Sequence, residues 1–216
     1  MKRIKRLAFV FIAMMVSAMI TTSCTKNDES TIVLLGEEQY IDDILDVIPD
    51  TLLTVFNKNF SIHRGYIPPN IEGSYCFSPK KRKLSSVPTQ YWPLSTIEPN
   101  VELKFSDQHN RVATFSHYEE LNTETDTVFI IGHDTYFTTY YIENILLDYG
   151  WGEVKYKRGI IYSGRMREQG IGGLAYASII MDVENYTNGH VETYPVGSFF
   201  LYEDGDGLAE KIDWVH

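Results

Sequence analysis

The sequence predicts a mainly β protein, with one closed antiparallel sheet of about eight strands preceded by a short helical segment. Three observations lead to this fold class. From residue 71 onward, short apolar segments alternate with turn residues at the spacing of hairpins. Aromatic residues, which favour strands, are abundant, with 15 Tyr, 11 Phe and 3 Trp. No helical pattern of the kind that connects parallel strands follows residue 70.

The first 24 residues predict a secretory signal of the bacterial lipoprotein type. A basic start is followed by the uncharged apolar stretch 7–20, and small residues then lead to Cys24. This stretch is shorter than the roughly 20 residues that a spanning helix needs, so a retained transmembrane anchor is the weaker alternative. We expect residues 1–23 to be removed and Cys24 to carry lipid, because several acyl chains together anchor a protein stably in a membrane.

Residues 24–36 are predicted to form a polar tether between the membrane and the domain. The acidic residues after Cys24 also resemble the signal that sends some Bacteroidetes lipoproteins to the outer face of the outer membrane. A tether without a sorting role is the equal alternative. The expected localisation is therefore the cell envelope, as an outer-membrane lipoprotein facing the periplasm or the cell surface.

Charge and length limit the possible partners. Removal of residues 1–23 leaves about 193 residues with 15 Lys and Arg against 29 Asp and Glu, a net charge of −14. A chain this acidic is not expected to bind nucleic acid, which requires a basic surface. The length fits one domain with a sizeable core. The one basic run, residues 80–83, is predicted to be a solvated loop, with contact to an anionic surface as the alternative.

The chain has two cysteines, and acylation of Cys24 would leave Cys76 without a disulfide partner. Cys76 lies in a segment that resembles a strand. We interpret it as a small buried apolar residue in preference to a reactive thiol.

Residues 37–65 are predicted to be a helical segment, because apolar residues recur there at spacings of three and four. Pro49 interrupts the pattern, so two short helices or one kinked helix is expected. Packing of the apolar stripe on the domain's own core is favoured over a lid or a helix that binds a partner.

Eight strands are predicted in the remaining domain, residues 66–216. Alternation is clearest where Val101, Leu103 and Phe105 are separated by charged residues. The predicted strands span residues 72–77, 101–105, 111–118, 127–131, 136–144, 154–162, 174–183 and 196–202. Their hairpin-scale spacing favours an antiparallel barrel or sandwich.

Three motifs occur in order along this domain: PPNIEGSY at residues 68–75, IIYSG at residues 160–164, and FLYEDGDGLAE at residues 200–210. They resemble motifs of a group of Bacteroidetes lipoproteins with lipocalin-like (calycin-like) barrels. The resemblance implies a lipocalin-like β-barrel of about eight strands over residues 66–216, but no particular activity. Tyr75 stands where a true lipocalin carries Trp, which weakens the implication that the barrel carries a ligand in the lipocalin manner.

Several aromatic residues are candidates for the lining of a ligand site at the mouth of the barrel. Aromatic rings line many small-molecule sites and would suit an apolar or carbohydrate ligand. Packing within the barrel core is the alternative. The candidates are Tyr91, Trp92, Tyr140, Trp151 and Tyr176.

No cofactor is expected, and the only metal hypothesis concerns Asp204 and Asp206. Calcium prefers six to eight oxygen ligands, and these two alternating acids with Glu210 are a weak calcium candidate. A surface turn is the favoured interpretation of that segment. The six histidines show no zinc-binding spacing.

No catalytic motif stands out, so the chain is not expected to be an enzyme. The leading hypothesis is a lipid-anchored, non-catalytic binding module for a small hydrophobic or glycan-derived ligand. The alternative is a structural or protein-interaction lipoprotein of the envelope with a solid barrel. A hydrolase is a third hypothesis, which requires clustered acids or a Ser–His pair with perturbed pKa values in a cleft.

Overall fold

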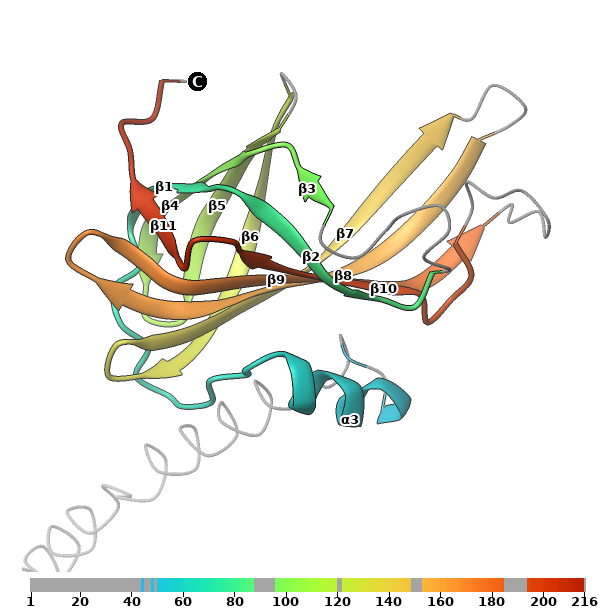
Figure 1. Cartoon of the computed structure of the whole chain (residues 1–216), viewed down its shortest axis with the longest axis horizontal. Coiled ribbons are helices and arrows are strands. Elements are labelled where there is room, and N and C mark those ends of the chain that lie inside the picture. Colours follow the sequence, from blue (N-terminus) through green and yellow to red (C-terminus); the bar gives the residue numbers. More distant parts are fainter. Residues whose placement is uncertain are drawn as a thin grey trace, which may run out of the picture. The chain divides into compact units, whose positions relative to one another are not determined.

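The structure, a computed structural model, describes residues 44, 48, 50–87, 96–119, 122–148, 153–184 and 194–215. These residues belong to one compact unit, Asp42–His216. They form a short helix, α3 (Asp50–Asn59), and an antiparallel sheet of eleven strands (Figure 1). The prediction of a mainly β, antiparallel protein is therefore confirmed. The predicted signal peptide, tether and lipid-bearing Cys24 lie outside the described residues.

The strands vary from two to fifteen residues in length. In chain order they are β1 (Gly73–Phe77), β2 (Lys80–Ser85), β3 (Ile97–Glu98), β4 (Val101–His109), β5 (Val112–Glu119), β6 (Asn122–His133), β7 (Tyr136–Asp148), β8 (Glu153–Arg167), β9 (Gly170–Glu184), β10 (Phe199–Asp204) and β11 (Leu208–Lys211). Each of the eight predicted strand segments overlaps one of them.

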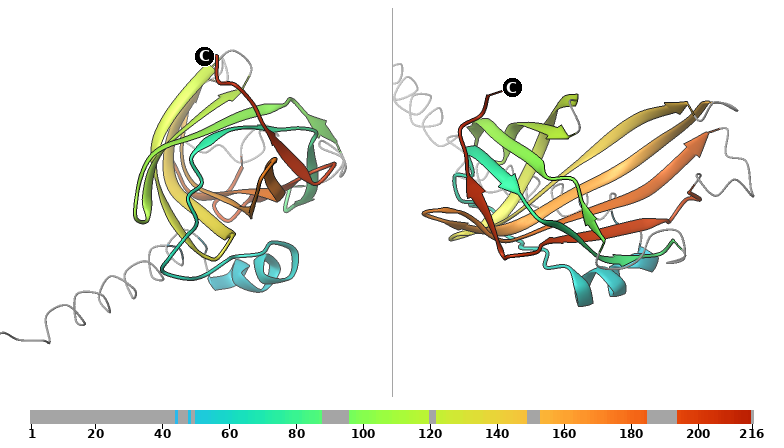
Figure 2. Two further views of the ribbon diagram at one scale, coloured as in Figure 1. Left: turned by 90° about the vertical axis from the view of Figure 1, so that its left-hand side faces the viewer. Right: turned by 45° about the horizontal axis from the view of Figure 1, so that its top comes forward.

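The sheet closes in part into a ring. Its order is β11-β1-β4-β5-β6-β7-β8-β9-β10-β2-β3, and β11 pairs with β9 as well as with β1. Only residues 78–79 separate β1 from β2, residues 99–100 separate β3 from β4, and residues 205–207 separate β10 from β11. We call this curved sheet the ring; the left panel of Figure 2 shows its curvature.

The ring encloses an aromatic core. Phe115 of β5 lies at its centre, with ring centroids 5.0 Å from Phe105, 5.2 Å from Tyr162 and 5.6 Å from Tyr141. These side chains come from alternate positions of their strands, which all point to the same face of a sheet. The apolar alternation of residues 101–105 therefore places Val101, Leu103 and Phe105 inside, where all three are buried.

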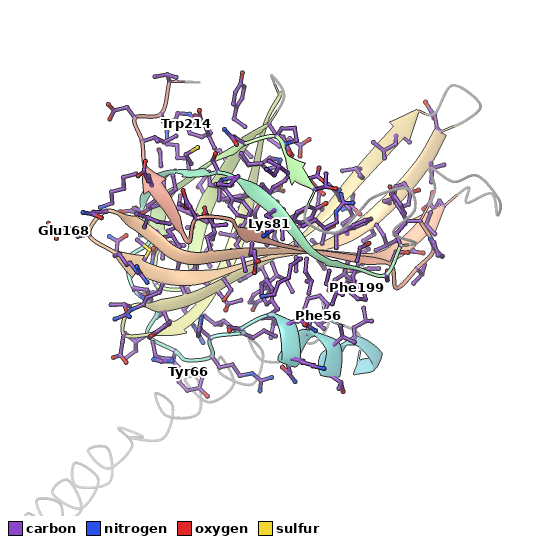
Figure 3. All side chains as sticks on the ribbon, in the orientation of Figure 1. Phe56, Tyr66, Lys81, Glu168, Phe199 and Trp214 are labelled. Carbon is purple, nitrogen blue, oxygen red and sulfur yellow. The ribbon has the colours of Figure 1, made fainter. Side chains whose placement is uncertain are left out.

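Helix α3 packs on the outer face of the ring. The apolar stripe predicted for this segment is buried, since Ile44, Ile48 and Phe56 are at most 1% exposed. The Phe56 ring lies 5.9 Å from that of Phe199 on β10, and Figure 3 shows the two side chains between helix and sheet. The stripe thus contacts the protein's own sheet. No helix in the described part of the chain is long and apolar enough to span a bilayer.

Helix α3 covers the part of the predicted segment 37–65 that follows Pro49, where the sequence predicts an interruption, and it ends at Asn59, before the predicted end. Of residues 37–49 the structure describes only Ile44 and Ile48, and the backbone N–H of Ile48 donates to the Ile44 carbonyl at 3.1 Å. The residues after Asn59 run over β7 and β8. The backbone N–H of His63 donates to Thr138 Oγ1 at 2.8 Å, and Ser163 Oγ donates to the Ser61 carbonyl at 2.5 Å. The buried hydroxyls of Thr138 and Ser163 therefore find partners on this segment.

The prediction of a solvated loop at residues 80–83 is wrong. This segment begins β2, which pairs with β10 and β3. Lys80 and Arg82 point into the ring and are 7% and 3% exposed, whereas Lys83 is exposed on the other face. The burial alternates along this strand, but the sequence shows no alternation because both faces carry cations.

Tyr75 ties the start of β1 to the segment before it. Its side chain is fully buried, and its hydroxyl lies 3.1 Å from the carbonyl oxygens of both Ile71 and Glu72. The hydroxyl donates to these carbonyl oxygens. Burial raises the pKa of Tyr75 to about 12, so the hydroxyl stays protonated.

We expect Tyr75→Phe to lower the free energy of unfolding by about 1 kcal/mol, the net value of a typical hydrogen bond. Urea denaturation followed by circular dichroism measures the change. Tyr66→Phe, at an exposed site, is the control and should leave the midpoint unchanged. Equal midpoints for Tyr75→Phe and the wild type would show that the Tyr75 hydroxyl does not contribute to the free energy of unfolding.

Candidate ligand-binding site

Three tyrosines form a row across the inner face of neighbouring strands. Tyr176 of β9 is paired in register with Tyr162 of β8 on one side and with Tyr202 of β10 on the other. The ring centroids are 4.9 Å apart for the first pair and 5.5 Å for the second. Directly opposed residues on one face of a sheet are close neighbours, so the register alone assembles this row. On β2, Arg82 is paired with Tyr202 and extends the row by a cation.

Ion pairs surround the tyrosine row inside the ring. Arg158 and Glu143 lie opposite each other on β8 and β7, and Arg158 Nε donates to Glu143 Oε2 at 2.6 Å. Lys80 Nζ lies 2.5 Å from Glu119 Oε1. The third pair joins Arg82 Nη2 to Glu98 Oε1. A buried charge is costly unless it is paired, and each of these three cations has a carboxylate partner.

Two of the cations also lie over aromatic rings. Lys80 Nζ is 5.2 Å from the centroid of the Tyr202 ring, and the Arg82 guanidinium is 5.4 Å from the same centroid. Arg82 Nη2 donates to the Tyr202 hydroxyl at 3.1 Å. Such contacts stabilise a desolvated cation through the negative face of the ring. They also hold Arg82 and Lys80 in fixed positions against the wall.

These groups line a cavity of about 280 Å³, which we call the ring cavity. One part of its wall is charged and the other is apolar. Its lining residues are Lys80, Arg82, Glu98, Glu119, Ile145, Leu147, Tyr156, Arg158, Tyr176, Ser178, Ile180, Tyr194, Phe200 and Tyr202. A smaller pocket of about 80 Å³ has four of these residues in its own lining and continues the space toward His117, Tyr141 and Glu143.

The apolar part of the wall lies beyond the charged groups. Tyr156 of β8, Ile180 of β9 and Val154 form a buried cluster, against which Ile145 and Tyr194 pack. The backbone N–H of Tyr194 donates to the Tyr156 hydroxyl at 3.2 Å. The ring cavity therefore combines apolar surface with a small number of fixed polar groups, as ligand pockets commonly do.

Burial changes the acidity of several groups here. It raises the pKa of Tyr162 well above 10 and also raises that of Tyr176, so both hydroxyls are protonated and can donate. The pKa of Glu143 is raised because burial outweighs the neighbouring Arg158. Burial also raises the pKa of Asp126 and lowers that of His117. Clustered acids with perturbed pKa values, which the hydrolase hypothesis requires, are thus present beside the cavity.

The predicted lining residues divide into three groups. Tyr176 lines the ring cavity, as the sequence predicts. Tyr140 is only 2% exposed and points to the outer face, where its ring stacks on Phe129 at 5.7 Å. The neighbouring Tyr141 faces inward instead. Tyr91, Trp92 and Trp151 lie outside the described residues.

Asp204 and Asp206, the calcium candidates, form the turn between β10 and β11. Asp204 Oδ1 accepts hydrogen bonds from the backbone N–H groups of Asp206 and Gly207, at 3.2 and 3.1 Å. Asp206 Oδ1 accepts one from Leu208 at 3.1 Å. Within the described ranges, no group of three or more His, Cys, Asp or Glu residues is placed to hold a metal ion. The contacts are those of an Asx turn, and calcium binding stays a prediction.

Asp204 gives a prediction about pH. Burial, together with the side chain of Asp206, raises the pKa of Asp204 from 3.8 to about 6. A carboxyl with a raised pKa stabilises the fold at low pH and loses that contribution as pH rises through its folded pKa. We therefore expect Asp204→Asn to become more stable relative to the wild type between pH 5 and pH 8.

Urea midpoints of the wild type and Asp204→Asn, each at pH 5 and pH 8, measure how the stability difference between them changes with pH. Asp107→Asn, at an exposed position of β4 with a positive φ that Asn tolerates, is the matched control. A difference between Asp204→Asn and the wild type that is the same at both pH values would contradict the prediction.

Cys76 is half-buried on the outer face of β1, between the inward side chains of Tyr75 and Phe77. Burial and the nearby carboxylates of Glu102, Asp204 and Glu210 raise the pKa of its thiol. A raised pKa lowers the thiolate fraction, so the interpretation of Cys76 as an unreactive residue agrees with its surroundings, although it is less buried than expected.

A second hollow, of about 400 Å³, lies on the outer face of the ring, where residues 59–63 pass over β8 and β9. Exposed side chains of Lys83, Arg165 and Arg167 form much of its rim. Lys83 is held only by an exposed ion pair with Glu203 at 3.0 Å. Exposed side chains fix a ligand less well than buried ones, so the ring cavity is the stronger candidate site despite its smaller volume.

Comparisons of this chain with protein-family models, curated proteins and solved structures find no match.

Proposed function

We propose that this protein is a lipid-anchored envelope protein whose lipocalin-like β-barrel binds a small ligand without catalysis. Membrane attachment would use Cys24, and residues 24–36 would carry the barrel away from the lipid. The closure of the antiparallel sheet through β11 supports the barrel assignment. The ring cavity is the observation that carries the binding function, because it is a pocket on the inner face of the sheet lined by aromatic side chains and paired charges.

The carboxylates at the ring cavity support binding over catalysis. Glu98, Glu119 and Glu143 each form an ion pair with a cation of the wall. A general acid or base must exchange protons with a substrate, and a carboxylate committed to a buried Arg or Lys is poorly placed to do so.

The alternative, a structural or interaction protein, is supported by a different surface. Ile142 and Leu146, on the outer face of β7, are 41% and 52% exposed. Exposed apolar residues on one strand can mark a protein contact. The ring cavity favours the ligand-binding proposal, because a solid barrel would leave no such space.

Two variants of β7 test the ligand-binding proposal. Ile145 lines the ring cavity, and the next residue, Leu146, points to the opposite face. Ile145→Trp should fill part of the ring cavity, and Leu146→Trp is its matched control. The measurement is ligand-observed saturation-transfer NMR of the full-length chain with N-phenyl-1-naphthylamine and a panel of neutral sugars.

We expect at least one of these probes to bind the wild type and Leu146→Trp, and to bind Ile145→Trp much more weakly. If no probe of either class binds the wild type, or if Ile145→Trp binds as well as Leu146→Trp, the proposal is overturned. Circular dichroism of each variant checks that it is folded.

The anchor is tested separately. Cells that express the protein are grown with radioactive palmitate, and the wild type should be labelled while Cys24→Ala is not. Continued labelling of Cys24→Ala would refute the anchor assignment.

A further inference from the structure

We infer that the ligand of the ring cavity is a neutral sugar of one or two rings. This inference rests on the proposed function and concerns the same site. It follows from the chemistry of the wall, which combines ion pairs, tyrosine hydroxyls and aromatic faces.

The ion pairs disfavour an apolar ligand. Lys80, Arg82 and Arg158 all line the ring cavity, together with Glu98 and Glu119. An apolar molecule would displace water from these charged groups and offer no hydrogen bonds in return. The desolvation of charges is strongly unfavourable when no new hydrogen bonds compensate it. The ligand must therefore carry polar groups where it meets this part of the wall.

The pairing of charges also disfavours an anion or a cation. Each of the three cations has its own carboxylate, Glu119 for Lys80, Glu98 for Arg82 and Glu143 for Arg158. The wall therefore offers strong donors and strong acceptors side by side with little net charge. A hydroxyl group both donates and accepts, so a ligand with several hydroxyls matches such pairs without an excess of either sign.

The aromatic side chains suit the C–H face of a sugar ring. Tyr156, Tyr176, Tyr194 and Phe200 line the ring cavity, and the rings of Tyr194 and Phe200 meet edge to face at 5.2 Å. The face of an aromatic ring is negative and attracts C–H groups that carry partial positive charge. The C–H face of a pyranose can pack on these rings while its hydroxyls point to the ion pairs.

The volume fits this size of ligand. The ring cavity of about 280 Å³ lies near the lower end of the roughly 300–1,000 Å³ found for small-molecule pockets. A monosaccharide or disaccharide suits a pocket of this size, whereas a longer glycan would extend into solvent.

The test is a binding titration of the full-length chain with glucose, galactose, N-acetylglucosamine, lactose and cellobiose. Glucuronate represents anionic sugars, and N-phenyl-1-naphthylamine represents apolar ligands. Two isosteric variants are compared. Glu98→Gln removes a charge inside the ring cavity, and Glu203→Gln removes one from an exposed ion pair on the outer face of β10.

We expect at least one neutral sugar to bind the wild type, with a dissociation constant about tenfold higher for Glu98→Gln, the loss typical of one charged hydrogen bond. Glu203→Gln should bind as the wild type does. An unchanged affinity in Glu98→Gln would overturn the assignment of the sugar to this wall.

The other outcomes separate the two proposals. If the apolar probe binds in the ring cavity, as its loss in Ile145→Trp would show, and no sugar binds, the sugar inference fails while the ligand-binding proposal stands. Binding of glucuronate without any neutral sugar would overturn the inference of a neutral ligand. If no probe binds at all, both proposals fail together.

Discussion

Phe115→Ala is expected to lower the free energy of unfolding by about 4 kcal/mol, within the range measured for buried Phe in other proteins. The Phe115 side chain is fully buried, and its ring contacts those of Phe105, Tyr141 and Tyr162 on three other strands. Removal of the Phe115 ring would leave a cavity between the four strands, and their paired backbones could not move together to fill it. Urea denaturation followed by tyrosine fluorescence measures the loss.

Tyr66→Ala is the control for this prediction, because Tyr66 is 47% exposed and contributes to no buried cluster of the ring. We expect it to change the free energy by about 0.5 kcal/mol. Similar losses in the two variants would show that Phe115 is not the centre of the core.

Arg158→Met is expected to destabilise the protein by about 3 kcal/mol at pH 8, because it leaves the Glu143 carboxylate buried without its partner. Glu143 is 6% exposed, and burial already raises its pKa with Arg158 present. A carboxyl with a raised pKa destabilises the fold as pH rises through that value and is harmless once protonated. The loss should therefore be smaller at pH 5 than at pH 8.

The double variant Glu143→Leu with Arg158→Met isolates this effect. Replacement of both partners by apolar residues removes the unpaired charge, so we expect it to recover most of the stability that Arg158→Met loses. Urea midpoints of the wild type, both single variants and the double variant complete the cycle. Losses that simply add, with no dependence on pH, would show that the pair does not behave as a buried ion pair.

The sequence predicts the fold best where the interior of the ring is apolar. Val101, Leu103 and Phe105 alternate with charged residues, and the alternation places them inside. Long strands such as β8 and β9 are also detected, because apolar and aromatic residues outnumber breakers along them. In these strands, most of the residues that are apolar in the sequence are also those whose side chains are buried.

The prediction fails where the interior is charged. Residues 80–83 read as a solvated run, yet Lys80 and Arg82 face the ring cavity. Hydrophobic periodicity cannot identify a strand whose inward residues are cations, because the partners that make their burial possible come from distant strands. Those partners, Glu119 on β5 and Glu98 on β3, carry no local signal that relates them to β2.

The candidate site shows the same limit at the level of single residues. The doublet Tyr140-Tyr141 has an aromatic ring on each face of β7, and the sequence alone does not say which one points inward. The register of β7 places Tyr141 inside and Tyr140 outside. Tyr176 was detectable as a candidate, but the tyrosine row that it forms depends on pairing with Tyr162 and Tyr202.

A polar ligand in the ring cavity would change the surroundings of the tyrosines that line it. An NMR titration of the full-length chain, labelled with ¹³C in its tyrosine rings, with each sugar of the panel detects this change. We expect the resonances of Tyr156, Tyr176 and Tyr202 to shift with one sugar while that of the exposed Tyr66 does not. Shifts confined to tyrosines outside the ring cavity, or no shift with any sugar, would contradict it.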